Sequence, residues 1–238
     1  MKFVDVIKLN QELGENLTGN EYKVAVISNI TINQIKEFFE LSLRTEGINT
    51  KMVVGGYDSI AQDSCEFAKM QAVLVFWEAC NLVDGLHCKA DLMTQDDLEV
   101  LADKVEIEID FVLRNLQNIP LVLVNRFSSL LFSSGALRNG ALTRLCDRLN
   151  VILESRVGPN QVIVDLDVVL AKVGLEDSVD RRQYMSSKAL YSLNFFREYV
   201  EAVKPAFMAA TGRAKKIIVL DCDNTLWGGI LGEDGASG

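Results

Sequence analysis

Five short apolar runs alternate with longer helical patterns, and this alternation limits the fold more than any other feature of the sequence. The runs cover residues 23–28, 50–54, 72–77, 121–125 and 161–164. Strands that are apolar along their whole length are buried on both faces, as in parallel sheets that are covered by crossover helices. The sequence therefore predicts a doubly wound α/β domain with a five-stranded parallel sheet over residues 20–212.

The segments between these runs carry helical signals. Residues 5–18 place apolar side chains on one stripe, which predicts an amphipathic helix ahead of the sheet. Thr31 is expected to cap a helix that extends to about Glu46, and Thr94 to cap another that extends to about Asn118. Two further helices are predicted over 136–155 and 190–210, the last with a core face formed by Leu193, Phe196, Val200 and Phe207.

A sixth apolar run, Lys215 to Leu220, follows the last helix and a turn that contains Gly212. A full helix separates this run from the fifth strand, so we expect it to open a second domain. The predicted domains are therefore 1–212, which includes the amino-terminal helix, and 213–238.

Two carboxylates, Asp221 and Asp223, directly follow the sixth run. Ligands bind at the carboxyl ends of parallel strands. Carboxylate oxygens are suitable ligands for Mg²⁺, and one carboxylate can attack phosphorus while the other moves protons. Thr225, with Asn224 and neighbouring N–H groups, is placed to bind phosphate oxygens. The pattern predicts Mg²⁺-dependent phosphoryl transfer.

The string from Leu220 to Gly235, LDCDNTLWGGILGEDG, resembles a known signature. Asp-x-Asp-x-Thr after an apolar strand is similar to the first motif of the haloacid dehalogenase-like (HAD) superfamily, and the wider string resembles the FkbH-like proteins of subfamily IIIC. That resemblance implies an SGNH-hydrolase-like, flavodoxin-like first domain followed by a Rossmann-like phosphatase domain. Some members load a glyceryl unit from a phosphorylated glycerate onto an acyl carrier protein.

The resemblance also implies roles for individual residues. Asp221 would be the nucleophile and a metal ligand, and Asp223 the general acid/base, with its backbone carbonyl on the metal. Mg²⁺ would be the cofactor, with a small phosphorylated metabolite and an acyl carrier protein as partners. The later motifs of the superfamily have no counterpart among the few residues after Gly232. We therefore expect a truncated catalytic domain with little or no phosphoryl-transfer activity of its own.

The first domain lacks the motifs of active SGNH hydrolases. Those enzymes carry Gly-Asp-Ser after the first strand, whereas this chain has Ser28 and Asn29 there. A serine nucleophile needs an adjacent base, and the one histidine of the chain, His87, is expected in a surface loop. A degenerate hydrolase fold used for binding or docking is therefore predicted, with candidate surface residues on the strand-end loops: Ser28, Asn29, Trp77, Glu78, Asn125 and Arg126.

Arg126 leaves two readings open. An arginine at the carboxyl end of a strand can bind an anionic group through two parallel hydrogen bonds. It can equally pair with one of the many acidic side chains of the protein.

Charge and cysteine content exclude several classes of function. The net charge of −9 argues against nucleic acid and against anionic membranes as partners, and no apolar run is long enough to span a bilayer. The five cysteines are scattered, which is typical of reduced thiols in a cytoplasmic protein. Three functions remain: part of a phosphoryl-transfer enzyme, a non-catalytic docking module, and an esterase with an atypical triad, which the missing histidine makes the weakest.

Overall fold

A parallel five-stranded sheet forms the centre of the protein. The computed structural model describes residues 2–132 and 140–214. Neighbouring strands follow the order β2-β1-β3-β4-β5, and every pair is parallel. This confirms the predicted fold class. The strands are β1 (Tyr22–Ser28), β2 (Thr50–Tyr57), β3 (Ala72–Phe76), β4 (Leu121–Asn125) and β5 (Gln161–Val164).

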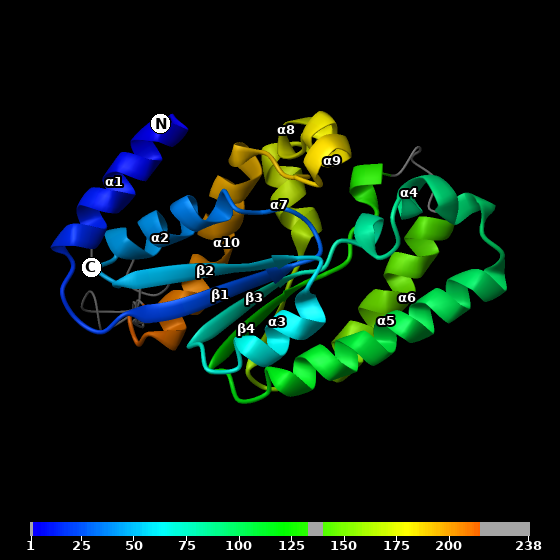
Figure 1. Cartoon of the computed structure of the whole chain (residues 1–238), viewed down its shortest axis with the longest axis horizontal. Coiled ribbons are helices and arrows are strands. Elements are labelled where there is room, and N and C mark those ends of the chain that lie inside the picture. Colours follow the sequence, from blue (N-terminus) through cyan, green and yellow to red (C-terminus); the bar gives the residue numbers. More distant parts are fainter. Residues whose placement is uncertain (1, 133–139, 215–238) are drawn as a thin grey trace, which may run out of the picture.

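Helices cover both faces of the sheet (Figure 1). One layer contains α1 (Phe3–Asn16), α2 (Ile35–Thr45), α7 (Leu166–Val173), α8 (Leu175–Ser178), α9 (Arg181–Ser187) and α10 (Leu193–Ala210). The other contains α3 (Ile60–Glu66), α4 (Leu86–Lys89), α5 (Gln95–Asn115) and α6 (Ala141–Arg156). The described part of the chain also contains 3-10 turns at η1 (Ala79–Asn81), η2 (Ala90–Leu92) and η3 (Leu130–Phe132).

Each strand contributes to two hydrophobic cores. Along β3, Leu74 and Phe76 belong to the core beneath α2 and α10, whereas Val73 and Val75 belong to the core beneath α5 and α6. Successive side chains of a strand point to opposite faces. Both faces are covered, so every position must be apolar, and this explains the continuous apolar runs of the sequence.

The predicted caps had different outcomes. Thr94 accepts a hydrogen bond from the Asp97 N–H, and the Asp97 side chain accepts one from the Thr94 N–H, so this capping box confirms the predicted start of α5. Thr31 does not cap α2, which begins after Gln34. The Thr31 hydroxyl instead donates to the backbone oxygen of Ser187, far along the chain, at 2.7 Å.

Two other details differ from the sequence predictions. Leu193 is 37% exposed and is not on the core face of α10, because Phe195 occupies the buried position of that first turn. The short helices α7 and α8 were not predicted.

No helix among the described residues is both long and apolar enough to cross a membrane. The boundary between residues 212 and 213 stays a prediction.

Candidate functional site at the carboxyl edge of the sheet

The carboxyl edge of the sheet has a topological switch point between β1 and β3. From β1 the chain crosses over to β2 on one side, and then to β3 on the other. Open parallel sheets bind ligands in the crevice at such a point, because the connections on its two sides lead away from each other. Ser28 ends β1 here, and Trp77 and Glu78 follow β3.

Ser28 faces a small cavity and is held by a local hydrogen bond. Its Oγ accepts from the N–H of Ile30 at 3.0 Å, and the residue is buried. The cavity has a volume of about 210 Å³ and extends between the ends of β1 and β2. Its polar lining consists of Ser28, Thr31, Asn33, Tyr57 and the backbone of Gly55 and Gly56.

An irregular register between β1 and β2 shapes this cavity. The pairing shifts between Val26 and Ser28, at the level of the glycine pair on β2. A Cβ on Gly55 would lie 2.1 Å from Oδ2 of Asp63 and 3.3 Å from the backbone oxygen of Val26. The same Asp63 oxygen accepts from the N–H of Gly56 at 2.8 Å. Only glycine therefore fits at position 55 while this carboxylate holds the turn.

Asn29 joins the ends of β1 and β3 by two reciprocal hydrogen bonds. Its Nδ2 donates to the backbone oxygen of Glu78 at 2.9 Å, and its Oδ1 accepts from the Glu78 N–H at 2.8 Å. Asn81 donates in turn to the backbone oxygen of Asn29 and to the Tyr57 hydroxyl. The side chain of Asn29 thus replaces a stretch of sheet ladder where the two strands diverge.

Glu78 is a carboxylic acid buried at the switch point. Only 1% of the residue is exposed, and its Oε1 accepts from the Tyr191 hydroxyl at 2.6 Å. Burial raises the pKa of Glu78 to about 7; the hydrogen bond from Tyr191 opposes the shift, and the negative charge of Asp167 adds to it. A carboxyl group that titrates near neutrality can hold or release a proton under ordinary conditions.

Asn125 extends the buried polar network to β4. Its Oδ1 accepts from the Tyr199 hydroxyl at 2.8 Å, while its Nδ2 has no hydrogen-bond partner among the described residues. Arg126, the next residue, lies 3.8 Å from a carboxylate oxygen of Asp165. The buried Nε of Arg126 has no hydrogen-bond partner among the described residues, so both readings stay predictions.

The prediction that the strand-end candidates lie on the surface is wrong for most of them. Arg126 is partly exposed, but the others are buried because later segments of the chain fold over them. The buried candidates are Ser28, Asn29, Trp77, Glu78 and Asn125.

Three tyrosines from the last part of the domain pack at the carboxyl ends of β3 and β4. Residues 174–192, which contain α8 and α9, are called the strap below. Tyr184 and Tyr191 belong to the strap, and Tyr199 belongs to α10. All three are buried, and the ring of Phe76 packs against Tyr191 and Tyr199 at centroid distances of 6.3 and 4.7 Å. Sequence reasoning missed these tyrosines, because no local pattern indicates which strand end they reach.

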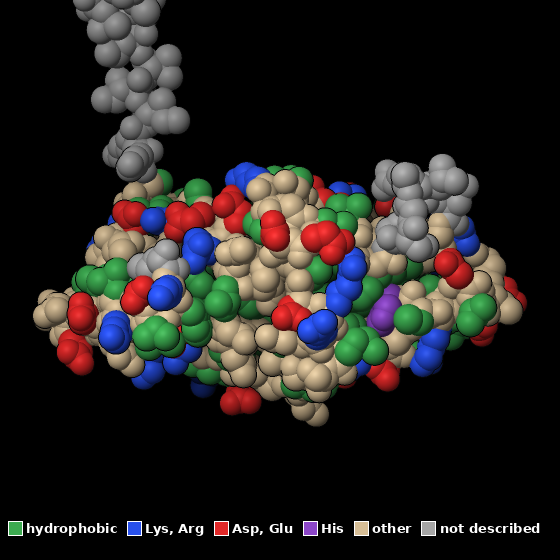
Figure 2. All heavy atoms as spheres, turned by 90° about the horizontal axis from the view of Figure 1, so that it is seen from above, with side chains coloured by type: hydrophobic (Ala, Val, Ile, Leu, Met, Phe, Trp, Pro, Cys, Tyr) green, Lys and Arg blue, Asp and Glu red, His purple; other side chains and the backbone are tan. Residues whose placement is uncertain are grey.

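His87 does not serve Ser28 as a base. It lies in α4 and not in a loop, half-buried, with its ring 4.3 Å from Phe132 and 5.7 Å from Tyr184 between centroids. No hydrogen bond joins the described side chains of His87 and Ser28. Burial lowers the pKa of His87. Its edge is visible in Figure 2, on a face where acidic and basic side chains are interspersed.

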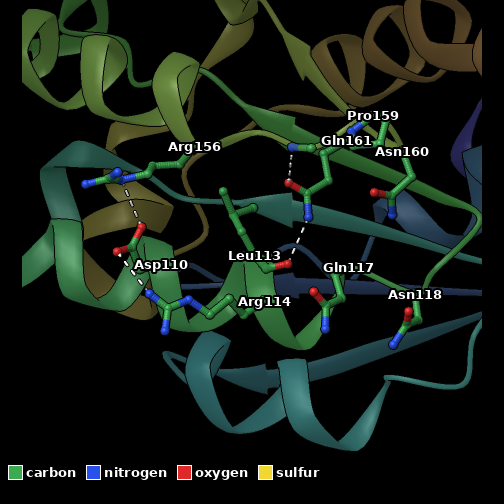
Figure 3. A pocket seen from close by; sticks show the side chains of 10 residues that line it. Asp110, Leu113, Arg114, Gln117, Asn118, Arg156, Pro159, Asn160 and Gln161 are labelled. Atoms are coloured by element: carbon green, nitrogen blue, oxygen red, sulfur yellow. Dashed lines mark hydrogen bonds and ion pairs between the residues drawn. The ribbon is translucent and has the colours of Figure 1, made fainter.

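A second hollow, of about 460 Å³, lies at the opposite edge of the sheet (Figure 3). Arg156 and Arg114 both approach Asp110, at 3.0 and 3.5 Å. Gln161 donates to the backbone oxygen of Leu113 at 2.9 Å, near the end of α5. Gln161 satisfies one of the last carbonyls of α5, and the arginines lie near its carboxyl end, where the helix dipole favours positive charge. The arrangement of these side chains is therefore structural.

The predicted metal and phosphate ligands cannot be placed. Asp221, Asp223, Asn224 and Thr225 all lie outside the described residues. Within residues 2–132 and 140–214, no three His, Cys, Asp or Glu side chains are grouped to hold a metal ion.

Comparisons with known proteins support the fold. The sequence matches no protein-family model, and no curated protein matches it. A solved structure, the N-terminal part of the protein BF1531 from Bacteroides fragilis, contains a phosphatase domain and is complexed with Mg. It superposes on this chain with a TM-score of 0.72 at 20% sequence identity. The match covers 99% of this chain but only 64% of the length of that structure.

A lipase from a goat rumen metagenome is also similar in structure. It gives a TM-score of 0.59 at 10% identity, over 83% of this chain and 99% of the lipase. At such identities the likeness shows the fold alone. The chain therefore has an α/β fold of the kind found in lipases, as an SGNH-hydrolase-like domain should.

Proposed function

We propose that this chain is the amino-terminal part of an FkbH-like protein of the HAD superfamily, which performs Mg²⁺-dependent phosphoryl transfer. The motif Asp221-Cys222-Asp223-Asn224-Thr225 after an apolar run carries this proposal. The likeness to a structure that contains a phosphatase domain supports it.

The proposed chemistry rests on two carboxylates of this chain. Asp221 attacks phosphorus and becomes an aspartyl-phosphate, while Asp223 gives a proton to the leaving oxygen and later takes one from the attacking water. The carboxylate of Asp221 and the backbone carbonyl of Asp223 would supply the oxygen ligands that Mg²⁺ prefers, and the bound ion would offset the repulsion between carboxylate and phosphate. Thr225 and Asn224 would position the phosphate oxygens.

Replacing the proposed nucleophile is expected to abolish phosphate release. In a form of the protein that continues past residue 238, Asp221→Asn should reduce Mg²⁺-dependent release from an acyl phosphate by at least about a thousandfold, because an amide cannot attack phosphorus. Asp96→Asn, at an exposed aspartate in the first turn of α5, is the matched control and should keep full activity. Full activity in Asp221→Asn would remove the assigned nucleophile.

For the described domain we propose binding, without hydrolysis. The observation that carries this part is the environment of Ser28, which faces a small cavity and has no hydrogen bond to the described histidine. The proposed partners are a small phosphorylated metabolite and an acyl carrier protein, both on the family resemblance. A titration with a carrier protein that shows no complex at high micromolar concentration would count against the second partner.

We expect no ester turnover that depends on Ser28. A buried serine without a base is a weak nucleophile, so Ser28→Ala should leave the slow hydrolysis of a short acyl ester at the level of the unchanged protein. Spectrophotometric release of p-nitrophenol from its acetate measures this. Turnover well above background that disappears in Ser28→Ala would favour the esterase reading instead.

A further inference from the structure

The strap has the construction of a small unit that folds on itself. The N–H of Asp180 donates to the backbone oxygen of Leu190 at 2.8 Å, and that of Ser192 to the backbone oxygen of Ser178 at 2.9 Å. Gly174, with φ of 92°, marks its start where α7 ends, and Ser192 caps α10 at its other end. In Figure 1, α8 and α9 lie together on the outer side of α7. The two ends are therefore the natural pivots.

Few bonds join the strap to the rest of the protein. Thr31 donates from its N–H to Lys188 and from its hydroxyl to Ser187, both to backbone oxygens. The ion pair between Lys188 and Asp84 is exposed, since 82% of the Asp84 side chain faces solvent, and such pairs add little stability. The Tyr184 hydroxyl donates to the backbone oxygen of Cys80 at 3.2 Å. The edges of the strap are thus held by replaceable hydrogen bonds.

The deepest contact of the strap is with a group that can ionise. Tyr191 reaches inward and donates its hydroxyl hydrogen to Glu78 at 2.6 Å. The other titratable groups that interact with this carboxyl are Asp167 of α7, Cys80 of η1, Cys146 of α6 and Tyr199 of α10. None of these groups is cationic, so within the described residues an ionised Glu78 has no opposite charge beside it while the strap is closed.

We propose that the strap is a proton-controlled gate, which opens as a unit from the carboxyl edge of the sheet when Glu78 releases its proton to solvent. Opening lets water hydrate the carboxylate and removes Tyr184 and Tyr191 from the crevice. It thereby gives a ligand access to the switch point between β1 and β3. The gate is a property of the described domain and holds whether or not the proposed phosphoryl chemistry is correct.

The direction in which pH shifts the opening equilibrium follows from the linkage between opening and proton release. Burial raises the pKa of Glu78 to about 7 when the strap is closed, whereas a hydrated glutamate titrates near 4.5. The closed form therefore keeps a proton that the open form releases, so the open fraction rises as pH increases from 4.5 to 7 and is constant above. The full change over this window is about 300-fold in the opening equilibrium.

Hydrogen–deuterium exchange can test the gate in the whole chain. After correction for intrinsic rates, the amide of Thr31, which donates to the strap at Lys188, should be less protected than the amides of β1 and β3 at every pH. Its protection should fall steeply between pH 5 and 7 and then level off. In Glu78→Gln it should be flat. Glu108→Gln, at a half-buried acid of α5 whose pKa is also raised, is the matched control and should behave as the unchanged protein.

A second variant covers the case in which Glu78→Gln fails to fold. Tyr191→Phe removes the hydrogen bond that stabilises the ionised carboxyl in the closed form, so the fall in protection should continue above pH 7. Equal protection of the Thr31 amide and the sheet amides would mean that the strap opens only with global unfolding, and would overturn the gate. Protection of the Thr31 amide that is independent of pH, or a pH dependence that persists in Glu78→Gln, would overturn the role of Glu78.

Discussion

Glu78→Gln is expected to stabilise the protein at pH 8 by about 3 kcal/mol and to have almost no effect at pH 4.5. Burial raises the pKa of Glu78 to about 7, so the folded protein holds a proton that the unfolded chain releases near pH 4.5. Between these values each pH unit costs the folded state about 1.4 kcal/mol. The penalty is complete above pH 7. Glutamine never ionises, and its oxygen can still accept from Tyr191.

Urea unfolding of both proteins at pH 5, 6, 7 and 8 measures this effect. The free energies of unfolding should diverge as pH rises, with most of the difference established by pH 7. Glu108→Gln should show a smaller divergence, because Glu108 is only half-buried. If the curves of Glu78→Gln and the unchanged protein ran parallel across the range, Glu78 would not be buried in its ionised form.

A buried acid that reduces the stability of the folded protein at neutral pH needs a functional explanation. Ordinary cores avoid such groups, and strongly shifted carboxyls gather at binding and catalytic sites. Glu78 lies at the switch point, beside the position where this fold places ligands. Its cost is therefore consistent with a functional role for the carboxyl edge, even though the usual hydrolase triad is absent.

Asn29→Ala is expected to reduce the free energy of unfolding by about 2 kcal/mol. The change leaves the buried N–H of Glu78 without a partner, whereas the carbonyl oxygen of Glu78 still accepts from the Asn81 N–H. An unpaired buried group costs about 1–3 kcal/mol. Because these bonds join the ends of β1 and β3, the loss should also loosen the loop that carries Glu78.

Asn49→Ala is the matched control for this change. Asn49 makes one solvent-reachable hydrogen bond, from its Nδ2 to the backbone oxygen of Gly19 at 3.1 Å, so its removal should cost less than about 0.5 kcal/mol. Chemical denaturation of both variants at pH 6 gives the comparison. Similar small losses would show that water or a local shift replaces the bonds of Asn29.

The strands were predictable because their signal is local. Residues such as Val73, Leu74 and Val75 are consecutive in the sequence, and only a strand buried on both faces accommodates such a run in a domain of this kind. The same applies to Thr94, whose cap depends on Asp97 three residues later. Thr31 was misread because its hydroxyl bonds to Ser187, which no window of a few residues could reveal.

The helices α7 and α8 and the extent of α9 escaped prediction for a related reason. Asp165 and Asp180 cap α7 and α9 and are recognisable signals, but the helices that follow are too short to show a clear apolar period. What fixes α9 is the burial of Tyr184 against α4 and η1, which lie about a hundred residues earlier in the chain.

The sequence by itself determined the α/β class, the five strand segments, the absence of a usable histidine beside Ser28, and the acidic motif after Leu220. The tertiary structure decided that Asn29 meets Glu78 across 49 residues and that Tyr191 meets it across 113. Periodicity and capping act over a few residues, so local patterns report them. Burial and hydrogen bonding at the carboxyl edge join side chains from distant elements, and only the packed sheet brings those elements together.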